Sequence, residues 1–140
     1  MKKKSRVLVF GVFDILHPGH LLFLQRARQL ADTLIVVVTR DARALAEKGK
    51  PPIFNEQERL HIIAGIGVVS KTRLGDRPGQ WTVLRRLHPD VLAVGHDQKV
   101  SKEAKDGPWK IVRIAARNRR RYSTSRIRKS LERTLSTPRE

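Results

Sequence analysis

The chain has 140 residues, no cysteine and a formal net charge of +17 at pH 7. Its length suits one domain with one hydrophobic core, and the lack of cysteine excludes a disulfide scaffold, a thiol nucleophile and a cysteine-based metal site. We therefore expect a single domain over residues 1–140 that includes the basic segment 117–140. Residues 110–140 supply much of the charge, with 11 basic and 2 acidic residues. Because positive charge attracts anions, we also expect an anionic substrate or partner.

Strands and helices alternate in the first part of the chain. The apolar run at 6–11 is typical of a buried strand, and residues 19–31 have apolar side chains at helical spacing. The run TLIVVVT at 33–39 is typical of a strand covered on both faces. Because the first apolar run is too short for a signal-peptide core or a membrane span, we expect a cytoplasmic protein without a membrane partner.

The second half continues the alternation. Asn55 and Glu58 predict a capped helix over residues 56–65, and Pro78 predicts the start of a helix over residues 78–87. The other expected elements are a short helix at 41–46, strands at 68–69, 90–95 and 110–114, a polar connection at 100–107, and a final helix at 124–135 capped by Ser123. This pattern predicts a Rossmann-like α/β domain, a mostly parallel sheet flanked by helices, which binds ligands outside the carboxyl ends of its strands.

The segment GVFDILHPGH, residues 11–20, joins the first strand to the first helix. Gly19 leaves room for a phosphate at the helix N-terminus, where free backbone N–H groups and the helix dipole attract anions. His17 and His20 flank this glycine and can donate hydrogen bonds or, when protonated, bring positive charge to a pentacoordinate phosphorus. We therefore predict that both histidines contact the reacting phosphate, with helix capping or metal ligation as the alternatives.

A phosphorylated acceptor would need no side chain as nucleophile, because its phosphate is already ionised. Catalysis then consists of positioning and charge stabilisation. Lys48 and Lys50 stand in a loop rich in glycine and proline, from which they can reach substrate phosphates; a solvated loop charge is the alternative for each. Arg126 lies one turn into the final helix and can clamp a phosphate with two hydrogen bonds.

Polar residues at other strand and helix ends complete the predicted site. Asp97 follows a strand and can accept hydrogen bonds from a ribose or a base. Ser123 and Thr124 can cap the final helix and bind phosphate together. Asp14 can orient the loop or a histidine, or act as a plain turn residue. Arg59 can pair with a phosphate or with an acidic partner.

Strand-GVFDILHPGH-helix resembles the HxGH signature of the cytidylyltransferase-like nucleotidyltransferases, which include glycerol-3-phosphate cytidylyltransferase and archaeal-type FAD synthase. Three further segments resemble that family in the same order: NEQER at 55–59, GHDQ at 95–98 and STSRIR at 123–128. Together with the residue arguments, the resemblance implies catalytic roles for His17, His20, Lys50 and Arg126, nucleotide contact by Val12, Phe13, His17, Pro18, Gly19, His20, Asp97, Ser123 and Thr124, and substrate contact by Asp14, Lys48 and Arg59.

The GHDQ segment resembles the GYDQ motif of archaeal FAD synthases, which adenylylate FMN. The resemblance therefore implies an FMN adenylyltransferase that takes ATP as its Mg²⁺ complex and releases pyrophosphate, without a metal cage built by the protein. A glycerol-3-phosphate or related cytidylyltransferase using CTP is the alternative. From another class, the basic run RNRRR at 117–121 leaves open a non-catalytic nucleic-acid-binding module. Relatives are often dimers, which leaves a homodimer open.

Overall fold

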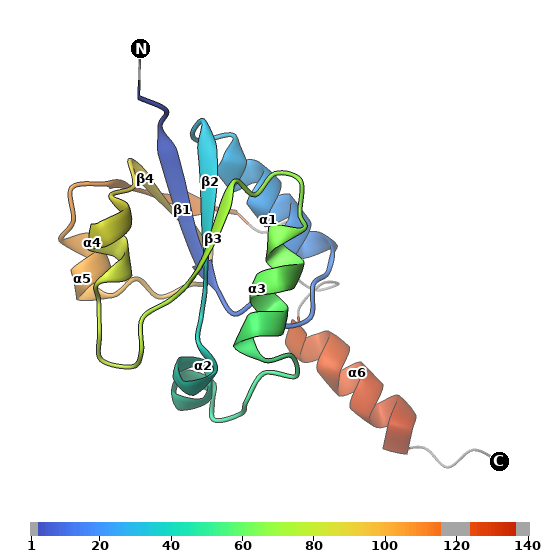
Figure 1. The fold of residues 1–140 in the computed structure, drawn as a ribbon. Coiled ribbons are helices and arrows are strands. Elements are labelled where there is room, and N and C mark those ends of the chain that lie inside the picture. The colour runs from blue at the N-terminus through green and yellow to red at the C-terminus, as the bar shows by residue number, and fades with distance from the viewer. Residues whose placement is uncertain (1–2, 116–123, 137–140) are drawn as a thin grey trace.

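The computed structural model of the chain describes residues 3–115 and 124–136; Ser123 and the RNRRR segment, with the roles expected of them, lie outside this part. Within it, five parallel strands form one sheet in the order β3-β2-β1-β4-β5 (Figure 1). The strands are β1 (Arg6–Gly11), β2 (Thr33–Val38), β3 (Lys71–Leu74), β4 (Val91–Gly95) and β5 (Lys110–Ile114). The predicted α/β architecture is confirmed.

Helices cover both faces of the sheet (Figure 1). They are α1 (Pro18–Arg28), α2 (Asp41–Lys48), α3 (Glu56–Ala64), α4 (Val83–Leu87), α5 (Lys102–Lys105) and α6 (Thr124–Ser136). Helices α1 and α3 lie on one face and α4 and α5 on the other, while α2 and α6 lie toward the carboxyl ends of the strands. In the described ranges, no helix combines the length and apolar character needed to cross a membrane.

The core forms one apolar cluster on each face of the sheet. Val7 and Val9 of β1 pack with Leu24 of α1 and Ile63 of α3 on one face. Leu8, between the two valines, points to the opposite face and packs with α4 and α5. Because β1 and β2 are buried on both faces, their sequences are near-continuous apolar runs, as the sequence predicted.

The edge strand and the polar connection differ from the prediction. The strand expected at 68–69 is wrong: β3 begins at Lys71, and its exposed and half-buried residues alternate, as in a strand at the rim of a sheet. Val68 and Val69 pack against the core just before that strand. The polar connection at 100–107 contains the one-turn helix α5, which Ser101 caps by accepting the backbone N–H of Ala104.

The helix expected at 78–87 begins only at Val83, so its predicted start is wrong. The carboxylate of Asp76 accepts the backbone N–H groups of Thr82 and Val83 at 2.8 and 2.9 Å. Gly79 has a φ of 82°, which places a turn inside the predicted helix. Asp76, seven residues upstream of Val83, therefore sets the start of the helix, with Pro78 still in the turn.

The strand order reverses at β1, which has β2 on one side and β4 on the other. It pairs with β2 along its whole length but with β4 through Val7 and Leu8, so the carboxyl ends of β1 and β4 separate. Gln98 bridges the gap: its Oε1 accepts the N–H of Gly95 at 3.1 Å, and its Nε2 donates to the carbonyl of Phe10 at 3.3 Å. Parallel sheets bind ligands at such a reversal.

Candidate active site

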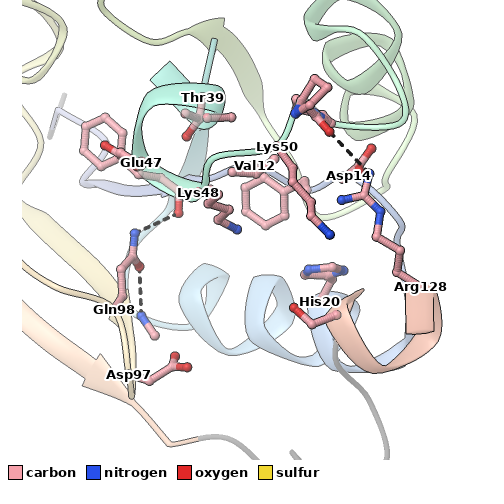
Figure 2. A pocket seen from close by; sticks show the side chains of 18 of the residues that line it. Val12, Asp14, His20, Thr39, Glu47, Lys48, Lys50, Asp97, Gln98 and Arg128 are labelled. Atoms are coloured by element: carbon pink, nitrogen blue, oxygen red, sulfur yellow. Dashed lines mark hydrogen bonds between the residues drawn. The ribbon is translucent and has the colours of Figure 1, made fainter. Parts of the chain in front are cut away.

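A cavity of about 690 Å³ opens at the carboxyl ends of β1 and β4 (Figure 2). Of the predicted residues that the structure describes, those lining it are Val12, Phe13, Asp14, His20, Lys48, Lys50 and Asp97. They come from three places in the chain: the β1–α1 loop with the start of α1, the end of α2 with the loop after it, and the turn after β4. The fold therefore gathers these segments around one space.

His17 and His20 stand at the first turn of α1 with their rings stacked, the centroids 3.9 Å apart. His17 caps the helix: its Nδ1 accepts the backbone N–H of Gly19 at 3.1 Å. The Nδ1 of His20 accepts the backbone N–H of His17 at 3.3 Å, which completes a reciprocal capping box. With Nδ1 an acceptor in both rings, each neutral imidazole carries its proton on Nε2 and offers that atom as a donor.

His20 is held neutral near pH 7. Burial, followed by the nearby His17 and Lys48, lowers the pKa of His20 to about 4. Burial also lowers the pKa of His17. Near neutrality the His20 ring therefore offers a hydrogen bond and not a positive charge, and a bound phosphate would raise its pKa again. Capping and hydrogen-bond donation are compatible, because they use opposite nitrogens of the ring.

The lowered pKa of His20 makes the stability of the fold depend on pH. Unfolding exposes the ring and restores its ordinary pKa of 6.5, so between pH 6.5 and about 4 the unfolded chain binds more protons than the folded one. The free energy of unfolding should therefore fall as the pH drops through that window. Thermal unfolding of His20→Gln across this range should show a shallower fall, while a matched change at the exposed His61, His61→Gln, should behave like the wild type.

Equal slopes for His20→Gln and the wild type would contradict the lowered pKa. Asp32 and Asp76 also have lowered pKa values, but from an ordinary value of 3.8, so their contribution is lost at more acidic pH.

Cationic side chains approach the cavity from α2, the loop after it, and α6. Figure 2 shows the ammonium ends of Lys48 and Lys50 directed toward the His20 side of the cavity. Arg128 of α6 also lines the cavity, and its guanidinium donates to the carbonyl of Pro51 at 3.3 Å. Helix α6 is thereby joined to the loop that carries Lys50.

Arg126, predicted as the phosphate clamp, is not among the lining residues. Two residues along a helix place Arg126 and Arg128 on different faces, so one of them turns toward the cavity and the other away from it. The sequence held a signal for Arg128: it lies four residues after Thr124, on the helix face that begins at the predicted phosphate-binding end.

Phe13 closes one wall of the cavity beside His20. Its backbone is left-handed, with a φ of 51°, and its ring meets that of His20 edge to face at 5.6 Å. The ring lies against Gly11, where an added Cβ would stand 2.5 Å from Cε2 of Phe13. Residue 11 must therefore be glycine for the aromatic ring to hold this position.

Asp14 and Arg59 join the β1–α1 loop to the segment before α3. Asp14 is buried, and its carboxylate accepts backbone N–H groups from Ile53 and Phe54 at 2.8 and 2.9 Å. The prediction is that Asp14 orients its own loop or a histidine; the loop that it binds is instead the one that carries Lys50.

Arg59 is fully buried, and its guanidinium donates to the carbonyls of Val12, Thr39 and Phe54 and to the carboxylate of Asp41. Of the two partners expected for Arg59, a phosphate or an acidic residue, the structure supports the acidic residue, which is Asp41. Substrate contact by Arg59 is wrong, because the guanidinium is enclosed by protein.

Asp97 lies in the turn after β4, with its carboxylate beside the cavity (Figure 2). Arg113 of β5 holds this turn by donating to the carbonyls of Gly95, His96 and Gln98 at 3.1, 3.3 and 2.9 Å. Gln98 and Arg113 shape the nucleotide end of the predicted site, yet neither was singled out from the sequence. For Gln98 the signal was its place directly after a strand at the point where the strand order reverses.

The carboxylates that line the cavity are Glu47, Asp97, Glu132 and the buried Asp14. Within residues 3–115 and 124–136, no group of three or more histidine, cysteine or acidic side chains is arranged to hold a metal ion. Isolated carboxylates among cations fit a divalent ion that arrives on phosphate oxygens, as Mg²⁺ commonly does, and do not form a cage of protein ligands.

Comparisons with known proteins show which family the chain resembles. The family model described as Cytidylyltransferase-like matches residues 8–130. A FAD synthase from Methanosarcina barkeri is 41% identical over 117 residues, covering 79% of this chain and 83% of that protein. A FAD synthase from Thermoplasma volcanium is 40% identical over 133 residues, covering 90% and 93%. The solved structure of a "lipopolysaccharide core biosynthesis protein" from Thermoplasma volcanium matches with a TM-score of 0.77 at 36% identity, covering 83% of this chain and 100% of that one.

Proposed function

The chain belongs to the cytidylyltransferase-like family and is a nucleotidyltransferase, and from this premise we propose that it adenylylates FMN with ATP, forming FAD and releasing pyrophosphate. One observation carries the site assignment: His20 and the start of α1 face the same cavity as Lys48, Lys50 and Arg128. The two similar FAD synthases support the choice of FMN as acceptor.

The reaction needs one bond to form and one to break. A phosphate oxygen of FMN attacks the α-phosphorus of ATP, and the bond from that phosphorus to the oxygen bridging to the β-phosphate breaks, so pyrophosphate leaves. The FMN phosphate is ionised near pH 7, so the attack requires no protein base. His20 donates through Nε2 to an oxygen of the α-phosphate as negative charge builds there, at the N-terminal end of α1 where the helix dipole is positive.

The cationic side chains have separate tasks in this mechanism. Lys48 and Lys50 bind the two reacting groups, the FMN phosphate and the α-phosphate of ATP. Arg128 binds the leaving pyrophosphate from the side of α6. Asp97 accepts hydrogen bonds from the ribose or the adenine. Mg²⁺, which we propose enters with ATP, would neutralise phosphate charge when bound, and Glu47, which lines the cavity beside Lys48, is the carboxylate that would help to hold it.

Removing either lysine should weaken substrate binding more than turnover. Lys48→Ala and Lys50→Ala should each raise the KM for a substrate about tenfold or more, because a charge-assisted hydrogen bond contributes about 1.5–3 kcal/mol. Steady-state kinetics with varied ATP and varied FMN measures both constants. Lys71→Ala, at the other end of the sheet, is the matched control and should leave KM unchanged. An unchanged KM in both cavity variants would remove these lysines from the site.

The acceptor is tested directly by product formation. The purified protein is incubated with Mg²⁺ and either ATP plus FMN or CTP plus glycerol 3-phosphate, and nucleotide products are separated while pyrophosphate is measured. FAD with matching pyrophosphate supports the proposal. Turnover with the second pair alone would assign the cytidylyltransferase alternative. Pyrophosphate from neither pair, together with RNA binding that falls steeply with salt, would favour a nucleic-acid-binding module.

A further inference from the structure

The cavity has two sides that come from different parts of the chain. One is the β1–α1 loop with His20, and the other is the end of α2 together with residues 49–55, here called the lysine loop. Residues 49–55 lie between α2 and α3, outside any helix or strand. Such a surface loop needs a tether if Lys50 is to keep a fixed place.

Hydrogen bonds tie the two sides together at the backbone of Phe54. Its N–H donates to Asp14 at 2.9 Å, and its carbonyl accepts from Arg59 at 3.0 Å. Asp14 also accepts the N–H of Ile53, while Arg59 also donates to the carbonyl of Val12 at 2.7 Å. One peptide segment of the lysine loop is thus bound from both sides to the residues between β1 and α1.

Of the residues in this tether, Asp14 is the one whose side chain comes from the β1–α1 loop. Its carboxylate is buried, and its two oxygens accept the N–H groups of Ile53 and Phe54 in the lysine loop, three and four residues after Lys50. The motif that carries the two histidines therefore also carries the anchor for the opposite wall. A role as an ordinary turn residue would require neither bond to a segment 39 residues away.

We propose that Asp14 is a positioning residue that holds Lys50 at the working distance from His20 across the transferred phosphate. It acts through the lysine loop, by fixing the backbone of Ile53 and Phe54. The inference rests on the proposed function, because it takes Lys50 to contact a substrate phosphate. It makes the position of Lys50 depend on Asp14: without the carboxylate of Asp14, the ammonium group of Lys50 keeps its charge but no longer lies beside the transferred phosphate.

The test is a double-mutant cycle between Asp14→Asn and Lys50→Ala. Asparagine keeps the size of the side chain, but its amide nitrogen cannot accept a backbone N–H, so at least one of the two bonds is lost. Because loss of Lys50 should act on KM more than on kcat, we expect Asp14→Asn to raise the same KM about tenfold in the wild-type background. It should have little further effect once Lys50 is alanine. The same cycle is measured on the Kd for ATP by calorimetry, which requires no acceptor.

Asp76→Asn is the matched control. The Asp76 carboxylate also accepts two backbone N–H groups in a loop, at 2.8 and 2.9 Å, but before α4. It should lower the thermal midpoint without changing KM. Ile53→Pro removes one donor to Asp14 from an exposed position and should raise KM as Asp14→Asn does, so it serves as a second test if Asp14→Asn folds poorly.

Two results would overturn the inference. Fully additive effects of Asp14→Asn and Lys50→Ala on both KM and Kd would show that Asp14 does not act through Lys50. An unchanged KM and Kd in Asp14→Asn would show that the tether has no role at the site. A wild-type protein that binds ATP but makes no FAD would instead refute the proposed function, and the cycle on Kd would still decide the role of Asp14.

Discussion

Replacing His20 with alanine should lower kcat about 10²-fold or more while the fold stays intact, because the variant loses a donor aimed at the developing charge on the α-phosphate. The lowered pKa of His20 sharpens this expectation. A ring that is neutral near pH 7 binds the ground state with a hydrogen bond that strengthens as negative charge builds on the phosphate. The loss should therefore appear mainly in kcat and less in the KM for ATP.

Steady-state rates of FAD and pyrophosphate formation measure this effect, with circular dichroism to verify folding. His61→Ala, on the exposed side of α3, is the control and should keep full activity. His17→Ala should also lose activity by about 10²-fold, and it should lose about 1 kcal/mol of stability as well, since His17 caps α1. Near-normal rates in both variants would refute the assignment of the two histidines.

The largest loss of stability should come from Arg59→Met. Methionine fills a similar length of buried space but leaves three carbonyls, those of Val12, Thr39 and Phe54, without their donor. The Asp41 side chain is 38% exposed and can turn to water, so the loss comes mainly from these carbonyls. At about 1–3 kcal/mol for each unsatisfied group, we expect the free energy of unfolding to fall by about 3–5 kcal/mol.

Chemical denaturation of Arg59→Met measures this loss, and Arg40→Met supplies the matched comparison. The pair of Arg40 with Glu56, at 3.2 Å, is partly exposed, with side-chain exposures of 32% and 23%, so its removal should cost about 1 kcal/mol or less. A loss in Arg59→Met no larger than that in Arg40→Met would contradict the account of Arg59 as the buried link between the two walls.

Features that depend on neighbouring residues could be predicted from the sequence. The strand, turn and helix around residues 11–20 follow from local periodicity, and the capping box of Asn55 and Glu58 is confirmed, with bonds of 2.8 and 3.1 Å. Reciprocal capping by His17 and His20 uses the same short range. In each case the partners lie within three residues, so the pattern of the chain contains the whole interaction.

Features that depend on distant partners could not be predicted. Nothing local shows that Asp14 binds the backbone near residue 54, or that the buried Arg59 donates hydrogen bonds to three segments of the chain, at Val12, at 39–41 and at Phe54. The choice between Arg126 and Arg128 depends on how α6 is rotated about its axis, which packing sets. The site residues whose contacts the sequence did not indicate are thus those whose place depends on segments far away along the chain.

Binding of α,β-methylene-ATP, followed by crystallography of the complex with Mg²⁺, tests most directly whether the first β–α junction holds the group to be transferred. The account predicts the α-phosphate at the N-terminus of α1, with one oxygen within hydrogen-bond reach of Nε2 of His20. A triphosphate bound away from this junction, with His20 in contact with none of its oxygens, would contradict it.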